Sequence, residues 1–262
     1  MIGRRVSTRM WLGLGVFTLA AGTAGAQPPP ALPIPATPVA QGGEGGEGGV
    51  DPELAARDPV EFLIAMDVMA AHFVAGRDIY RLGEAQAAGE MFAHPIAEVY
   101  VGLEEVLARL GVAEFREAME RASTLALDRA PTPEVERAAA AVLAALIEAE
   151  SRAPAPGGTP KVQALVIASM ADRAAEQYVA ALREPERLEP YLDGYGLYRA
   201  AADRAARMAP ALGSPQLEHV RPAIEALVAV LALAYPTATR PASPVDAAPL
   251  TAAAERLAQI LN

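Results

Sequence analysis

Two of the three histidines lie in one stretch of the chain, residues 66–105, together with many carboxylates and methionines. His72 comes about one helical turn after Met69, and Glu98 follows His94 by four residues. Imidazole beside thioether and carboxylate groups suits copper or haem iron, and imidazole with carboxylates alone suits ferric or zinc ions. We therefore take His72, His94 and Glu98 as the candidate metal ligands.

The same residues also fit an ordinary helical core. Met66 and Met69 recur at helical spacing with Phe62 and Phe73, which is the usual role of methionine as a filler between apolar side chains. On this interpretation His72 lies at the edge of the core and is hydrogen-bonded to a carboxylate or a backbone carbonyl. Both interpretations stay open at the level of sequence.

Pro95 decides how the second histidine is placed. Glu90, His94 and Glu98 are four residues apart and would share one helical face, but a proline clashes with the carbonyl four residues before it. We expect one helix to end near His94 and the next to begin at Pro95, with the chain reversing there. His94 would then face His72 across a helix pair. One ion can bridge the two side chains only if they lie within about 8 Å, because metal–nitrogen bonds are near 2 Å.

The sequence offers no support for catalysis. It contains no cysteine, which excludes disulfides, thiolate metal sites and cysteine nucleophiles. It also lacks the G-x-S-x-G, S-x-x-K and H-E-x-x-H motifs, and the paired Glu-x-x-His of di-iron bundles. We expect no catalytic residues and a protein that is not an enzyme.

The first 50 residues predict export. Residues 1–26 combine three arginines, a short apolar run and a final Ala-Gly-Ala, the pattern of a signal peptide cleaved after Ala26. The apolar run is shorter than the roughly 20 residues of a permanent anchor, so we expect no stable membrane insertion after cleavage. Residues 27–50 are rich in proline and glycine and predict a disordered leader. The expected location is the periplasm, or the medium outside the cell.

The charge balance limits the partners. The chain has 22 basic and 32 acidic residues. Removing the three arginines of the signal leaves 19 basic against 32 acidic residues, a net charge near −13. Nucleic acid is excluded as a partner because phosphate binding needs a basic surface. A cation or a basic protein suits the negative field of this chain as a partner. The alternative is that the charge serves only to keep the chain soluble.

Five dipeptides indicate helix starts after residue 50. Each places Asp, Thr or Ser before a proline, which is typical of an N-cap followed by the first helical position. Apolar residues then recur every three or four positions, and no segment alternates as a strand does. The dipeptides are Asp58-Pro59, Thr132-Pro133, Thr159-Pro160, Ser214-Pro215 and Ser243-Pro244. We expect an all-α domain over 51–262, with helices near 59–82, 84–93, 95–110, 112–129, 133–153, 160–183, 188–209, 215–235 and 244–261.

The domain divides at an alanine- and proline-rich stretch, which suggests two packed helical bundles from a duplicated segment. The halves would be 51–153 and 160–262. Tyr80 and Tyr100 are 20 residues apart in the first half, as are Tyr178 and Tyr198 in the second.

Two segments resemble a known family. Imelysin-like and EfeO-like helical periplasmic proteins, which are linked to bacterial iron uptake, are similar to the chain in two regions. The first region comprises His72-Phe-Val-Ala-Gly-Arg-Asp-Ile-Tyr80 and residues 93–100, and the second is residues 170–204. The resemblance covers about half of the mature chain and implies a helical fold and metal binding. In place of the family's G-x-H-x-x-E pattern the chain has His94-Pro-Ile-Ala-Glu98, so only His94 and Glu98 carry over.

The sequence therefore predicts an all-α, exported binding protein. We expect a metal ion such as iron or copper as its ligand, held by His72, His94 and Glu98. The alternative is a structural or protein–protein interaction module that holds no ligand.

Overall fold

The computed structural model describes residues 50–212, 215 and 217–261. All regular structure in these residues is helical, which confirms the predicted all-α bundle. The predicted signal peptide and leader lie outside the described residues. The helices are α1 (Pro52–Ala55), α2 (Pro59–Arg81), α3 (Ala85–Pro95), η1 (Ile96–Tyr100), α4 (Val101–Arg109), α5 (Arg116–Leu127), α6 (Thr132–Glu150), α7 (Pro160–Arg183), α8 (Glu189–Arg207), α9 (Ala209–Leu212), α10 (Arg221–Ala234) and α11 (Ala248–Leu261).

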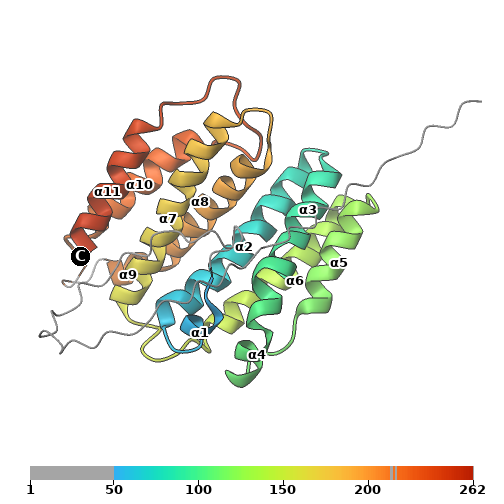
Figure 1. Cartoon of the computed structure of the whole chain (residues 1–262), viewed down its shortest axis with the longest axis horizontal. Helices are drawn as coiled ribbons and strands as arrows, with labels where there is room; N and C mark the ends of the chain where they lie inside the picture. The colour runs from blue at the N-terminus through green and yellow to red at the C-terminus, as the bar shows by residue number, and fades with distance from the viewer. Residues whose placement is uncertain (1–49, 213–214, 216, 262) are drawn as a thin grey trace, which may run out of the picture. The chain divides into compact units, whose positions relative to one another are not determined.

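Helix α2 lies between two groups of helices (Figure 1). On one side it packs against α3 and α6, and α5 closes that group by contacting both of them. On the other side it packs against α8 and α7, which in turn contact α10 and α11. Of its residues, fifteen are buried, and they include Phe62, Met66, Met69 and Phe73. The apolar stripe of the sequence is thus the centre of the core.

By composition alone α2 could cross a membrane, since its 23 residues include a window with a mean hydropathy of 1.4. In the structure 72% of that window is buried against other helices. A core helix of a folded domain has the same composition, because both must be apolar on most faces. Burial identifies α2 as such a core helix.

Two of the predicted helix starts have the expected caps. The Asp58 carboxylate accepts the N–H of Val60 at 2.7 Å, and the Thr159 hydroxyl accepts that of Val162 at 3.4 Å. Each cap satisfies a donor that the first turn leaves without a partner. The prediction at Ser243-Pro244 was wrong: α11 begins at Ala248, where the side chain of Asp246 accepts the N–H of that residue at 3.1 Å.

The helix start predicted at Pro95 was also wrong. Pro95 is the last residue of α3, and the chain continues through the five-residue π-helix η1 into α4. A proline removes one i to i−4 hydrogen bond, and a π turn is a known way for a helix to absorb such a defect without breaking. His94 is therefore a helical residue, and the reversal of the chain lies before α3.

A tyrosine near the end of α2 and another near the end of α7 make similar contacts. Tyr80, near the end of α2, donates its hydroxyl to the carbonyl of Ala130, between α5 and α6. Tyr178, near the end of α7, donates to the carbonyl of Val245, between α10 and α11, at 3.0 Å. Each tyrosine thus binds the end of its helix to a connection between two later helices, α5 and α6 for Tyr80, and α10 and α11 for Tyr178. The duplication itself stays a prediction, and this parallel agrees with it.

Two glycines allow α8 to lie against its neighbours. A Cβ atom at Gly196 would come within 2.4 Å of the backbone oxygen of Ala71 on α2. A Cβ atom at Gly194 would come within 1.8 Å of the hydroxyl of Tyr235. Helices are ordinarily 8–10 Å apart because side chains separate them, so a contact through a glycine brings the two axes unusually close. The polar residues on the facing sides of α2 and α8 are held together by this contact.

We expect Gly196→Ala to destabilise the protein by about 1 to 3 kcal/mol, because the new methyl group meets backbone rather than a movable side chain. The matched control is Gly102→Ala in α4, where the new Cβ would lie 3.5 Å from Pro52. This control should be neutral or gain up to about 1 kcal/mol from helix propensity. Urea unfolding measures both variants, and equal effects would contradict the proposed contact.

Candidate functional site

His72 lies within α2 and is 6% exposed. Its Nδ1 lies 2.9 Å from the carbonyl oxygen of Val68, one turn earlier. Because a carbonyl can only accept, Nδ1 carries the proton, and the lone pair of the neutral ring is on Nε2. Metal-binding histidines are held in the same way, with one nitrogen donating to the protein and the other free to coordinate.

Burial lowers the pKa of His72 from its ordinary value of 6.5 to about 4. The hydrogen bond to Val68 opposes this lowering of the pKa, His94 adds to it, and Glu189 opposes it; the value of about 4 includes all four causes. The imidazole is therefore neutral at pH 7, which is the form that binds a metal ion.

Asp193 of α8 faces this lone pair. Its Oδ1 lies 3.7 Å from Nε2 of His72, and the residue is 6% exposed. Gly196, three residues after Asp193, permits the approach of α8 to α2 that makes this distance possible. An imidazole nitrogen and a carboxylate oxygen are both ligands that transition-metal ions accept, so the two groups can serve one cation.

His94 of α3 completes a group of three polar side chains from three helices. The centres of the His72 and His94 rings are 6.3 Å apart, and the ring planes meet at 74°. This distance is within the 8 Å limit for a shared ion. Nδ1 of His94 is buried, and no described residue forms a hydrogen bond with it. We call His72, His94 and Asp193 the histidine cluster.

Two cavities border the histidine cluster. One, of about 90 Å³, is lined by His72, Asp193, Arg173 and Glu176 among others. The other, of about 200 Å³, is lined by His94 together with the carboxylates of Glu90 and Glu189. The second cavity gives small ions a negatively charged approach to His94.

Glu98 is placed differently from the sequence prediction. It is exposed on the π-helix η1, and it does not line either cavity of the histidine cluster. Within the described part of the chain, no group of three or more His, Asp or Glu side chains already has the spacing of a metal site. A metal at the histidine cluster would thus draw its ligands closer together.

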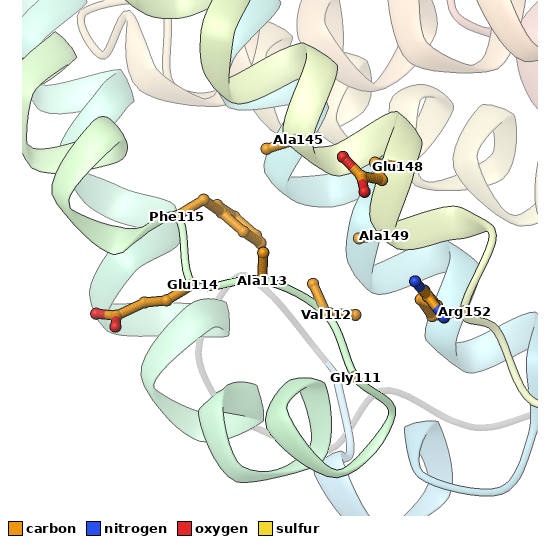
Figure 2. A pocket seen from close by; sticks show the side chains of 9 residues that line it. All are labelled: Gly111, Val112, Ala113, Glu114, Phe115, Ala145, Glu148, Ala149 and Arg152. Carbon is orange, nitrogen blue, oxygen red and sulfur yellow. The ribbon is translucent and has the colours of Figure 1, made fainter.

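Other recesses lack such chemistry. Figure 2 shows one between the α4–α5 connection, with Val112 and Phe115, and the end of α6, with Glu148 and Arg152. Its volume of about 50 Å³ holds only a few water molecules. A recess of about 510 Å³ between α7 and α11 has carboxylates on its rim and an alanine-rich floor, but no histidine lines it.

A buried ion pair lies on another side of α2. Arg204 of α8 is 1% exposed and binds both oxygens of Asp67 on α2, with Nη2 to Oδ1 at 2.7 Å. The same guanidinium reaches Gln163 of α7 at 2.6 Å and Glu150 of α6 at 3.0 Å. This network joins four helices, and its partners satisfy the desolvated charge of Arg204.

Sequence reasoning missed Asp193 and Arg204. Both lie on α8, more than 100 residues from their partners on α2, so no local spacing links them. The one local signal is Asp193-Gly-Tyr-Gly196, because glycine in the middle of a helix is unfavourable unless another element packs closely there.

The comparisons with known proteins found no family, no curated protein and no solved structure that matches this chain. The site is therefore interpreted from its own geometry.

The lowered pKa of His72 predicts a stability change with pH. Below pH 6.5 the unfolded chain binds a proton on this imidazole and the folded protein does not, so stability is lost as the pH falls from 6.5 towards 4. We expect His72 to contribute a loss of about 2 to 3 kcal/mol between pH 7 and pH 4.5.

Urea unfolding of the wild type and of His72→Leu at both pH values isolates this effect, since other groups titrate in both proteins. The variant should lose less stability on acidification than the wild type. Identical pH dependence in the two proteins would contradict a buried, neutral His72.

The ion pair yields a second prediction. Asp67→Leu should cost about 3 to 5 kcal/mol, because Arg204 loses its main partner inside the protein. The double variant Asp67→Leu with Arg204→Met should recover most of this loss in urea unfolding. Asp203→Asn is the control, since Asp203 is 76% exposed and its ion pair contributes little. Equal losses in the single and double variants would argue against the pair.

Proposed function

We propose that this chain is an exported, helical metal-binding protein that holds one divalent transition-metal ion at the histidine cluster. The observation that carries the proposal is the 3.7 Å approach of the His72 Nε2 lone pair to the Asp193 carboxylate, in a buried place beside a second imidazole. Two ligands on one tetrahedral ion are about 3.4 Å apart when each bond is near 2.1 Å. The observed distance is close to that value.

The third ligand in this proposal is His94 rather than Glu98. Two imidazoles on one ion have ring centres roughly 5 to 6 Å apart. The 6.3 Å between His72 and His94 therefore needs a small rotation of a ring on ion binding. Glu98 is exposed and lines neither cavity of the cluster, so it has no place in this ligand set.

The ligand atoms of the histidine cluster limit which metal ions can bind there. Imidazole and carboxylate ligands suit copper, iron and zinc, and divalent copper heads the affinity order among them. Without cysteine the chain offers no thiolate for monovalent copper. Together with the resemblance to iron-uptake proteins, this supports a role in capturing or delivering copper or iron outside the cytoplasm, without catalysis.

Metal titration tests this function. The exported protein should bind one equivalent of Cu²⁺ by isothermal titration calorimetry, and the double variant His72→Ala, His94→Ala should lose that binding. The matched control is His219→Ala, because His219 is the third histidine and is exposed. No stoichiometric binding, or equal loss in the control, would contradict the proposal.

A second pair of variants separates the two ligand sets. Asp193→Asn should weaken Cu²⁺ binding by roughly tenfold or more, whereas Glu98→Gln should leave it unchanged. The opposite result would return Glu98 to the site.

Export is tested by mass spectrometry. We propose that the chain is processed after Ala26, because residues 1–26 have the charge, apolar run and small residues of a signal peptide. Protein isolated from the periplasmic fraction should begin at Gln27. An intact N-terminus, or cytoplasmic protein alone, would contradict export.

The alternative is a structural or protein–protein interaction module. It is favoured by the fact that the described residues contain no preformed group of three metal ligands. In that case the purified protein would hold no metal, and the titration above would show no saturable binding.

A further inference from the structure

A groove of about 310 Å³ lies between α2, α6 and α8. Its middle is apolar, with Val74 and Ala70 on α2 and Leu143 and Ile147 on α6. Ile147 is 55% exposed, although a large aliphatic side chain ordinarily avoids water. The volume is within the range of small-molecule sites.

One end of the groove has an excess of positive charge. Arg77 of α2 and Arg199 of α8 both line it, and both reach the carboxylate of Asp78, at 2.9 and 3.2 Å. Arg81 also reaches Asp78, but Glu136 offsets its charge. Two guanidinium groups thus share one carboxylate, and this arrangement favours a further anionic group.

The other end has an excess of negative charge. Asp67, Glu150 and Asp203 line it, together with Arg207. Arg204 lies behind them and binds Asp67 and Glu150. Three carboxylates face two guanidinium groups here, and the one with the weakest pairing is Asp203, whose distance to Arg207 is 3.7 Å. This end favours a cationic group.

Along α2 the two ends are about 15 Å apart, because Asp67 and Arg77 are ten residues apart at 1.5 Å per residue, whereas along α8 Arg199 and Asp203 are four residues, about 6 Å, apart. We propose that the groove binds a short apolar peptide with free termini. Its α-carboxylate lies at Arg77 and Arg199, and its α-ammonium lies at Asp203 and Glu150. An extended chain of roughly two to four residues spans these distances. A fatty acid would leave the acidic end unmatched, and a polyanion would be repelled by it.

This groove is separate from the histidine cluster. A helix turns 100° per residue, so His72 points about 160° away from Val74 around α2. The groove and the two cavities of the cluster have no lining residue in common. Peptide binding in the groove can therefore be tested independently of metal binding.

The test uses the tetrapeptide Ala-Leu-Leu-Ala on the metal-free full-length mature protein. Calorimetry should show one saturable site for the free peptide. N-acetylation or C-amidation should each weaken binding roughly tenfold or more, because each removes a charge-assisted contact. The comparison of free and blocked peptides needs no protein variant, so its result does not depend on whether a variant folds. No saturation at millimolar peptide, or equal binding of free and blocked peptides, would overturn the proposal.

Variants locate the site. Arg77→Gln and Asp203→Asn should each weaken the free peptide about tenfold, and Arg77→Gln should have no further effect on the C-amidated peptide. Arg121→Gln, at an exposed position of α5 outside the groove, is the control and should bind like the wild type. Sedimentation in the absence of peptide tests the competing occupant. A dimer that Ile147→Asp dissociates would mean that a second copy covers the groove, and it would overturn the peptide proposal.

Discussion

Helices α2 and α8 touch through their backbones at Ala71 and Gly196, and the polar features of this protein depend on that contact. The approach brings Asp193 to His72 on one side of α2. On another side it brings Arg204 to Asp67. A side chain larger than hydrogen at position 196 would separate the helices, and both pairs of groups would move apart together. Small residues at this place are therefore a condition for the site.

The energetics differ on the two sides. Arg204 has carboxylate and amide partners on three other helices, so its buried charge is compensated and fixes how the two helix groups meet. The histidine cluster is less complete, since burial keeps His72 neutral and Nδ1 of His94 has no hydrogen-bond partner among the described residues. Buried polar groups that need a further partner are more typical of binding sites than of structural networks.

Local signals were sufficient for the fold and insufficient for the site. The caps at Asp58 and Thr159 and the apolar spacing behind them predicted α2 and α7 correctly, because those interactions lie within a few residues of each other. Pro95 led to the prediction of a helix start that is absent, because a proline's effect depends on whether a π turn can absorb the lost hydrogen bond. The expected helix pair placed His94 near His72, although the chain reverses before α3 and not at Pro95 as predicted. Asp193 could not follow from it, because only packing across 121 residues of chain brings it to His72.

The most direct test of the metal-binding account is the position of an ion in a crystal of the copper-loaded protein, located by anomalous diffraction. Metal binding at the histidine cluster predicts one strong peak within about 2.2 Å of Nε2 of His72, with Asp193 and His94 as its other protein ligands. A peak at Glu98 or His219 alone, or no ordered copper beside His72, would contradict it.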